Sequence, residues 1–186
     1  MKKIFFLLTF ACICSSFAVE LENQTLKPLP QCTANISRFK EVHPFLFRGA
    51  QPENYADLEC LKNTGIKTII NLIDKPKELI YFEKTLAKAL DINYFSFPTS
   101  GILPPEDEHI QAILKELIKK ENQPVFIHCH YGKDRTGLIV GLYRVWYDHW
   151  EPGQAWEEML SFGFNKYFLG LSYYFWSKAA GIKPNE

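Results

Sequence analysis

Ten consecutive residues, 128–137, gather side chains that could do chemistry, and they read His-Cys-His-Tyr-Gly-Lys-Asp-Arg-Thr-Gly. They lie between a short apolar run at 124–128, which predicts a buried strand, and an apolar stretch at 137–148, which predicts a central helix. At such a strand-to-helix turn, consecutive backbone N–H groups can point into one concavity, and the helix N-terminus adds positive potential there. The sequence therefore predicts a site for a phosphate-sized anion at this turn.

Cys129 is the candidate nucleophile of this turn. The backbone donors that would hold an anion there would also stabilise a thiolate. Gly132 permits the tight turn, and Arg135 can return across it so that its planar guanidinium binds two phosphate oxygens. A lone cysteine at a strand end could instead be an inert core thiol, but the glycine, the arginine and the Thr136 hydroxyl at these spacings favour catalysis.

The stretch resembles the signature of cysteine-dependent protein tyrosine and dual-specificity phosphatases, HCx5R followed by a hydroxyl residue and a glycine. The expected elements over about residues 40–180, and the Arg-Gly-Ala-Gln-Pro turn at 48–52, are also similar to the compact atypical dual-specificity members. The resemblance implies that Cys129 attacks phosphorus to form a phosphocysteine intermediate and that Arg135 binds the substrate and steadies the transition state. It also implies that His128 orients the loop, that Thr136 assists departure of the thiolate, and that no metal or other cofactor takes part.

The remaining residues of the signature are expected to bind the substrate. The substrate-binding candidates are His130, Tyr131, Gly132, Lys133, Thr136 and Gly137. Lys133 adds a cation beside Arg135, which favours a substrate with more than one phosphate, such as a phosphoinositide or an inositol polyphosphate. The alternative for Lys133 is a solvated lysine on the loop rim. Metal binding by the two histidines is not expected, because adjacent side chains on a strand point to opposite faces.

The general acid is where the sequence departs from the family's pattern. Most members place an Asp about thirty residues before the cysteine, whereas the corresponding loop here reads Phe-Pro-Thr-Ser-Gly at 97–101. The Lys-Asp-Arg-Thr run at 133–136 resembles lipid-type phosphatases such as myotubularins, in which an Asp at this place has the acid role. Asp134 is therefore the preferred acid. Glu106, Asp107 and Glu108 are the alternatives, although acidic residues in a helix's first turn also complement its dipole.

Three functions are compatible with these residues. The first is a metal-independent phosphatase of the protein tyrosine or dual-specificity type, acting on phosphorylated proteins. The second uses the same scaffold on phosphoinositides or inositol polyphosphates. The third is a pseudophosphatase, which binds phosphate without turnover. Intact Cys129 and Arg135 count against the third function, and the missing upstream Asp counts for it.

Composition limits the possible partners. The 21 Lys and Arg residues balance 21 Asp and Glu residues, so no overall basic surface for nucleic acid or an anionic bilayer is expected. The aromatic stretch at 167–176 could contact a membrane, but core packing is the preferred interpretation. The pattern leaves the oligomeric state open.

The pattern of apolar residues predicts the elements around the site. Strands are expected at 45–47, 68–72, 94–97 and 124–128, and helices at 55–63, 78–90, 110–118, 137–148, 153–162 and 166–179. Strands that alternate with helices indicate an α/β fold, a single domain with a mostly parallel central sheet flanked by helices. The resemblance implies that this is the dual-specificity phosphatase fold.

The first eighteen residues have the pattern of an export signal: two lysines, an apolar run at 4–13, and a small-x-small site that ends at Ala18. A buried hydrophobic helix is the alternative. The expected organisation is a signal peptide at 1–18, a loosely ordered arm at 19–38 and a phosphatase domain at 39–186, exported to a periplasm or secreted. In an oxidising compartment Cys32 and Cys60 could form a disulfide, or they could be two ordinary buried thiols.

Overall fold

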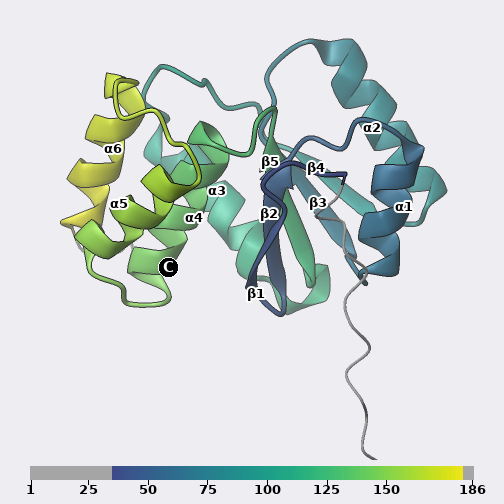
Figure 1. Ribbon diagram of the computed structural model, residues 1–186, viewed down its shortest axis with the longest axis horizontal. Coiled ribbons are helices and arrows are strands. Elements are labelled where there is room, and N and C mark those ends of the chain that lie inside the picture. The colour runs from purple at the N-terminus through teal and green to yellow at the C-terminus, as the bar shows by residue number, and fades with distance from the viewer. Residues whose placement is uncertain (1–34, 182–186) are drawn as a thin grey trace, which may run out of the picture.

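The computed structural model describes residues 35–181, which form a five-stranded sheet with helices on both faces (Figure 1). The strand order is β1-β2-β5-β3-β4, with β1 antiparallel to β2 and every other neighbouring pair parallel. The predicted α/β fold with a mostly parallel sheet is therefore confirmed. The strands are β1 (Lys40–His43), β2 (Leu46–Ala50), β3 (Thr68–Asn71), β4 (Asn93–Ser96) and β5 (Val125–Cys129).

The helices lie in two groups. Figure 1 shows α1 and α2 on one side of the sheet and α3 to α6 on the other. Parallel strands covered in this way are buried on both faces, which explains the unbroken apolar runs of β3 and β5. The helices are α1 (Tyr55–Asn63), α2 (Lys77–Ala89), α3 (Asp107–Ile118), α4 (Asp134–Trp146), α5 (Pro152–Ser161) and α6 (Leu169–Ala179), and a short 3₁₀ helix spans Lys120–Asn122.

The central strand β5 divides the hydrophobic core between the two faces. Ile127 and Cys129 belong to the cluster that contains the buried residues of α3 to α6, whereas Phe126 belongs to the cluster on the side of α1 and α2. The ring of His128 stacks on Phe126, with centroids 5.5 Å apart. Because successive side chains of a strand point to opposite faces, the first two residues of the signature face different halves of the core.

Helix α4 is the central helix that the sequence predicts, and almost all of its residues are buried. It begins at Asp134, three residues before the expected start at 137. Its first turn therefore contains Asp134 and Arg135, and an acidic residue in this position complements the helix dipole. The earlier start places the arginine of the signature on the helix itself.

The N-terminal boundary of the domain differs from the prediction. The side chain of Ile36 is 1% exposed, and the backbone N–H of Ala50 donates to the Ser37 carbonyl over 2.8 Å. Ile36 and Ser37 thus contact β2, so packed residues begin before the boundary at 39 that the sequence predicts. The edge strand β1 was also not predicted, because its half-exposed residues show no apolar alternation.

Several sequence predictions concern residues before position 35, which the structure does not describe. The expected signal peptide at 1–18 and the arm residues 19–34 lie outside the described residues. Cys60 is disulfide-bonded, while Cys32, its predicted partner, also lies outside them. Within residues 35–181, no helix has the length and apolar character needed to cross a membrane.

Candidate active site

The signature loop, residues 128–136, joins the end of β5 to the start of α4. Cys129 is the last residue of β5, its side chain is 3% exposed, and it lines a hollow of about 360 Å³. This hollow opens at the carboxyl edge of the parallel strands, where open α/β sheets bind their ligands. We call it the Cys129 hollow, and it is lined by Gly101, Ile102, Cys129, Tyr131, Lys133, Asp134, Arg135, Gly163, Asn165 and Phe168.

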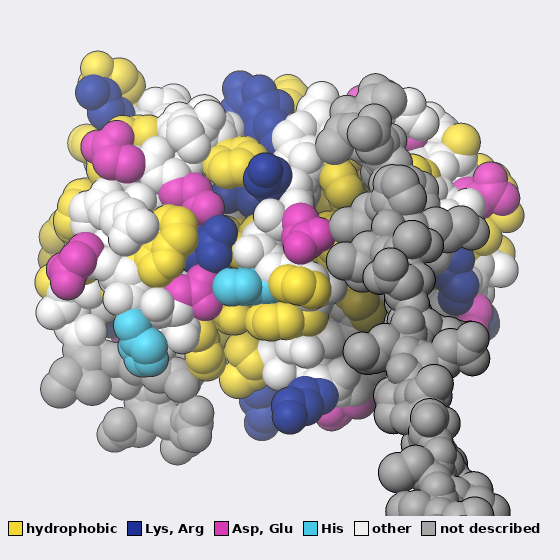
Figure 2. All heavy atoms as spheres, turned by 60° about the horizontal axis from the view of Figure 1, so that its bottom comes forward, with side chains coloured by type: hydrophobic (Ala, Val, Ile, Leu, Met, Phe, Trp, Pro, Cys, Tyr) yellow, Lys and Arg dark blue, Asp and Glu magenta, His cyan; other side chains and the backbone are white. Residues whose placement is uncertain are grey.

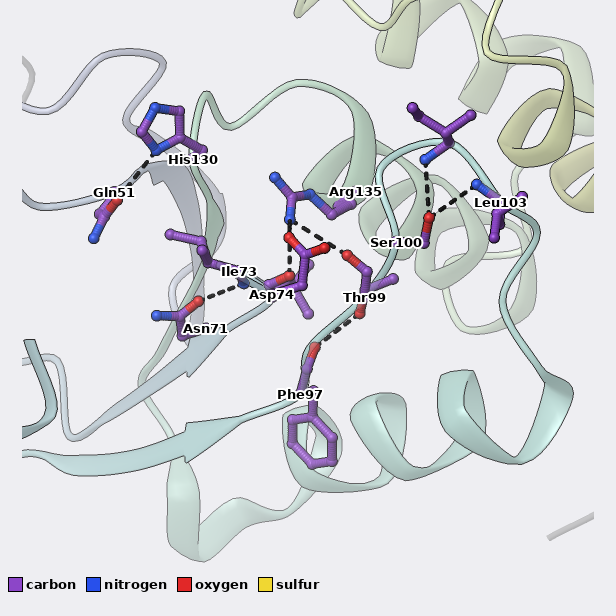
Figure 3. Close-up of polar contacts among 12 residues, drawn as sticks. Gln51, Asn71, Ile73, Asp74, Phe97, Thr99, Ser100, Leu103, His130 and Arg135 are labelled. Carbon is purple, nitrogen blue, oxygen red and sulfur yellow. Dashed lines mark hydrogen bonds and ion pairs between the residues drawn. The ribbon is translucent and has the colours of Figure 1, made fainter. Parts of the chain in front are cut away.

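Arg135 is held by the ends of two neighbouring strands. Its Nη1 donates to the Leu72 carbonyl (3.2 Å), to Asp74 Oδ1 (3.0 Å) and to the Thr99 carbonyl (3.3 Å), as Figure 3 shows in part. Leu72 directly follows β3, and Thr99 lies three residues after β4. Among the described residues, Nε and Nη2 of Arg135 have no hydrogen-bond partner. That side of the guanidinium is therefore available to bind an anion.

Asp74 is a residue of the site that the sequence analysis missed. Its side chain is 37% exposed and forms an ion pair with Arg135. It follows the predicted strand at 68–72 by two positions. Because the carboxyl ends of parallel strands meet at one edge of the sheet, an acidic residue just after such a strand is the signal that could have revealed it.

Of the candidate general acids, Asp134 lines the Cys129 hollow. Its Oδ1 accepts a hydrogen bond of 2.7 Å from the backbone N–H of Asn165. The carboxylate thereby connects the first turn of α4 with the segment between α5 and α6. A role as proton donor and this anchoring role are compatible, since a carboxyl group has a second oxygen.

The alternative acids lie elsewhere. Asp107 accepts hydrogen bonds from Lys178 Nζ (2.5 Å) and from the Tyr174 hydroxyl (3.0 Å), so it joins α3 to α6. The hydrogen bond from Lys178, and with it that from Tyr174, holds the pKa of Asp107 below its usual range. Neither this residue nor Glu106 or Glu108 lines the Cys129 hollow.

Gly132 allows the signature loop to lie against β2. Its φ is +66°, and a Cβ at this position would come within 2.5 Å of the backbone carbon and oxygen of Gly49. The backbone N–H of Gln51 also donates to the His130 carbonyl over 3.3 Å. The turn expected at 48–52 is wrong for residues 48–50, which form the end of β2 and pair with β5. The segment 48–52 supports the loop directly, and only glycine fits at position 132.

His128 lies on the far side of β5 from the Cys129 hollow. Its Nε2 is 2.8 Å from Glu83 Oε1, and both side chains are fully buried. The other carboxylate oxygen of Glu83 accepts hydrogen bonds from Asn71 Nδ2 (2.8 Å) and the Tyr94 hydroxyl (3.1 Å). Burial, followed by the nearby Glu83, raises the pKa of Tyr94 far above its usual range. The ring of His128 is thus held by its contact with Glu83 and by stacking on Phe126, while neither of its nitrogens has a hydrogen-bond partner among the described residues.

The predicted substrate-binding residues have different surroundings in the structure. His130 lines a second hollow of about 450 Å³, next to α2, and its Nδ1 is 3.3 Å from Gln51 Oε1. Tyr131 is exposed and lines both hollows, and Lys133 lines only the Cys129 hollow. Thr136 is buried, and its hydroxyl has no hydrogen-bond partner among the described residues.

The structure gives no sign of a metal cluster within residues 35–181, where no group of three or more His, Cys, Asp or Glu side chains could hold an ion. The two histidines of the signature occupy different environments, one in the buried network with Glu83 and one on the second hollow.

Comparison with known proteins agrees with this geometry. The tyrosine phosphatase family matches the chain over residues 34–169. The chain belongs to this family. The resemblance predicted from the signature is therefore confirmed, and the matched range includes both the loop at 128–136 and the supporting segment at 48–52.

Among curated relatives in this superfamily, the dual specificity protein phosphatase TpbA of Pseudomonas aeruginosa is 30% identical over 124 residues, which cover 66% of this chain and 53% of that protein. The inositol diphosphatase DSP4 of Arabidopsis thaliana is 34% identical over 110 residues, covering 57% of this chain and 54% of that protein. The chain thus spans about half the length of these relatives.

Two solved structures show the same fold. The crystal structure of TpbA superposes with a TM-score of 0.64 at 25% identity and covers 76% of this chain and 84% of that one. The core catalytic domain of the PP-IP phosphatase SIW14 from Saccharomyces cerevisiae gives a TM-score of 0.58 at 27% identity, covering 70% of this chain and 78% of that one. The predicted phosphatase fold is confirmed by these neighbours.

Proposed function

We propose that the protein is a metal-independent phosphatase of the tyrosine or dual-specificity type, which hydrolyses phosphomonoesters through a phosphocysteine intermediate. One observation carries the proposal: Cys129 and Arg135 line the same hollow, at the N-terminus of α4. A helix N-terminus attracts a dianionic phosphate, and the guanidinium can bind two of its oxygens. Membership in the tyrosine phosphatase family supports the same chemistry.

The proposed reaction has two steps. The Cys129 thiolate attacks phosphorus, a sulfur–phosphorus bond forms, and the bond from phosphorus to the leaving oxygen breaks while that oxygen receives a proton. Water then attacks phosphorus, and its oxygen bonds to phosphorus while the sulfur–phosphorus bond breaks. The proton of the water passes to the carboxylate that gave up a proton in the first step, so that inorganic phosphate leaves and the thiolate is restored. Arg135 balances charge on the phosphoryl oxygens in both transition states. In this scheme Asp134 supplies the proton, and the buried Thr136 hydroxyl donates a hydrogen bond to the departing sulfur.

The rim of the Cys129 hollow supports an aryl phosphate as substrate. Ile102, Tyr131 and Phe168 come from three separate segments and place apolar side chains around the hollow, and the first two are well exposed. Such a rim suits an aromatic ring, which buries a large apolar area. A solved structure of TpbA contains phosphotyrosine, which agrees with this choice for the present chain.

The deciding experiment measures hydrolysis of p-nitrophenyl phosphate by the mature protein in EDTA. We expect turnover that vanadate blocks and that Cys129→Ser abolishes, together with a phosphorylated Cys129 peptide after rapid acid quenching. A folded wild-type protein that binds vanadate without any turnover would instead establish the pseudophosphatase function. Turnover that needs added metal, or that survives in Cys129→Ser, would contradict the proposal.

An inositol polyphosphate or phosphoinositide is the second candidate substrate. Lys133 lines the hollow beside Arg135, and inositol diphosphatases are among the relatives. A phosphate-release panel of phosphotyrosine peptides, phosphoserine peptides, phosphoinositides and soluble inositol phosphates would separate the candidates by kcat/KM. Phosphotyrosine as the best substrate supports the main proposal, and an inositol polyphosphate as the best substrate supports the alternative.

We further propose that the protein is exported through the signal peptide at 1–18 to a periplasm or the medium. The supporting pattern is the lysine pair followed by a ten-residue apolar run and a small-x-small site at Ala18. Intact-mass analysis of the expressed protein tests this proposal. Export predicts a mature chain that starts at Val19, and an uncleaved chain that stays in the cytoplasm would contradict it.

A further inference from the structure

Arg48 is a fully buried arginine that lies against the signature loop but does not belong to the signature. It sits in β2 with 1% of its side chain exposed, and it pairs in parallel register with Ile127 of β5. Its Nη2 donates to the Gly132 carbonyl over 3.1 Å. The guanidinium carbon lies 4.0 Å from the centre of the Phe162 ring. Arg48 thus touches the loop between Cys129 and Arg135 from inside the protein.

Among the described residues, no carboxylate forms an ion pair with Arg48. Burial lowers the pKa of Arg48 to about 10, so the group is still charged at neutral pH. Its Nε and Nη1 are buried, and neither finds a hydrogen-bond partner in the described residues. A buried charge is costly unless an opposite charge lies nearby. The charges that act on it are those of Glu158, Cys129, Arg144 and Arg38.

The carboxylate that acts on Arg48, Glu158, is already engaged. Arg144 binds Glu158 with two hydrogen bonds, from Nε to Oε2 (3.2 Å) and from Nη2 to Oε1 (2.9 Å). Arg38 carries the same sign as Arg48 and adds no compensation. Of the groups that act on Arg48, only the Cys129 sulfur becomes an anion in the proposed reaction. The Cys129 thiolate therefore adds a second opposite charge, beside that of Glu158, to the surroundings of the buried cation.

We infer that Arg48 is a positioning residue of the nucleophile loop, which stabilises the Cys129 thiolate with a fixed buried charge while it holds the Gly132 carbonyl. This inference rests on the proposed function. In a planar trans peptide the carbonyl and the following N–H point in opposite directions. Fixing the Gly132 carbonyl toward Arg48 therefore turns the N–H of Lys133 away from the interior, the direction needed to meet an anion in the hollow that Lys133 lines.

The test compares Arg48→Lys with Arg48→Gln in the full chain. Both replacements keep a donor for the Gly132 carbonyl, but only lysine keeps the charge. The readout is the pH midpoint of Cys129 alkylation by iodoacetamide, followed by mass spectrometry of the Cys129 peptide, together with kcat and KM for p-nitrophenyl phosphate. Phe162→Leu serves as the control, because it loosens the packing around the guanidinium and removes no charge.

We expect Arg48→Gln to raise the alkylation midpoint by about 0.5 to 1 pH unit or more, since an opposite charge close to an ionisable group favours its ionised form. At pH 6, kcat/KM should fall about tenfold, mainly through kcat. Arg48→Lys and Phe162→Leu should keep the wild-type midpoint. Equal midpoints in the Gln and Lys variants would overturn the inference, because the charge would then have no effect.

The outcome separates this inference from the proposed function. Alkylation needs no turnover, so a wild-type protein that is inactive on every phosphomonoester would sink the proposed function and leave the alkylation comparison intact. If the wild type is active and Arg48→Gln leaves the pH midpoint of Cys129 alkylation unchanged, the inference about Arg48 is contradicted and the proposed function is not. Thermal unfolding of each variant shows that the compared proteins are folded.

Discussion

At the scale of single residues, two aspartates with similar positions in the sequence have different contacts in the structure. Asp134 and Asp107 both stand in the first turn of a helix, where either carboxylate complements the dipole. The structure places Asp134 on the Cys129 hollow and commits Asp107 to hydrogen bonds with α6. The choice between them as general acid is therefore a matter of position, and it can be tested with matched variants.

We predict that Asp134→Asn lowers kcat for phenyl phosphate about 100-fold or more, because general acids contribute about 10²- to 10⁴-fold. The amide oxygen can still accept the hydrogen bond from the Asn165 N–H, so the loss reports the missing proton and not a loosened loop. The loss should be much smaller for p-nitrophenyl phosphate, whose leaving group needs less protonation. The measurement is kcat against pH, where the variant should lose the basic limb.

Asp107→Asn is the control for this experiment and should keep the wild-type pH profile. A basic limb that persists in Asp134→Asn, or that disappears in Asp107→Asn, would show that Asp134 is not the acid.

Asp74 is predicted to act on catalysis through Arg135. Asp74→Asn removes the charge of the 3.0 Å ion pair but keeps the side-chain shape. We expect kcat to fall about three- to tenfold, as for the loss of about 0.7–1.4 kcal/mol from a partly exposed pair. KM should stay the same or decrease, since a negative charge near the phosphate is also removed. Steady-state kinetics on p-nitrophenyl phosphate would show this split.

The matched variant for Asp74 is Asp91→Asn, at a fully exposed aspartate 3.9 Å from Lys62 Nζ. It should leave both constants unchanged. An unchanged kcat in Asp74→Asn would mean that the two backbone carbonyls alone hold Arg135.

At the scale of elements, the apolar patterns placed most helices and parallel strands, although the strand expected at 45–47 is β2 at Leu46–Ala50 and the helix expected at 137–148 begins at Asp134. The prediction for 55–63 agrees with α1, and those for 68–72 and 124–128 agree with β3 and β5 to within a residue at each end. The surrounding elements bury these segments. Their residues are therefore mostly apolar, which makes the segments recognisable in the sequence. β1 escaped prediction because it is a half-exposed edge strand whose position depends on pairing with β2.

Two residues of the site were not predicted for the same reason, which is that their positions depend on contacts between distant parts of the chain. Arg48 and Asp74 act through partners that are 84 and 61 positions away in the chain, Gly132 and Arg135. A short motif can reveal Cys129 and Arg135 because their spacing is local. Contacts between β2 and the signature loop, or between the β3 end and α4, depend on the sheet order, which no local pattern specifies.

The packing of α4 against α5 and α6 gives a prediction for stability. A Cβ at Gly141 would lie 2.5 Å from Met159 Sδ and 3.2 Å from Phe175, both fully buried. Overpacking costs about 1–3 kcal/mol, whereas replacing a helical Gly by Ala returns about 1 kcal/mol. We therefore expect Gly141→Ala to destabilise the protein by up to about 2 kcal/mol and to lower Tm by up to about 6 °C.

Gly153→Ala is the comparison for this variant. Gly153 lies in α5 with no atom within 4 Å of the added Cβ, so only the helix preference remains. Calorimetry should show an unchanged or slightly higher Tm. Equal Tm changes in the two alanine variants would mean that Met159 moves aside without cost.

At the scale of the whole molecule, the charges cancel, so any preference for highly charged substrates must arise inside the hollow. The sequence carries 21 basic and 21 acidic residues, and Figure 2 shows both kinds interspersed on one face. Long-range steering is therefore weak. In the proposed function Arg135 binds the first phosphate, so Lys133, which lines the same hollow, is the cation proposed to bind a second one.

We predict that Lys133→Met lowers kcat/KM for an inositol polyphosphate about tenfold, the effect of losing one charge-assisted contact of about 1.4 kcal/mol. For p-nitrophenyl phosphate, which has a single phosphate, the change should stay within about twofold. Lys166→Met is the control, since Lys166 is exposed and does not line the hollow. The difference between the substrates should shrink as salt is raised, because ions screen an exposed contact. Equal losses of kcat/KM on both substrates would show that Lys133 supports the loop and does not bind a second phosphate. The structural argument for a polyphosphorylated substrate would then be lost.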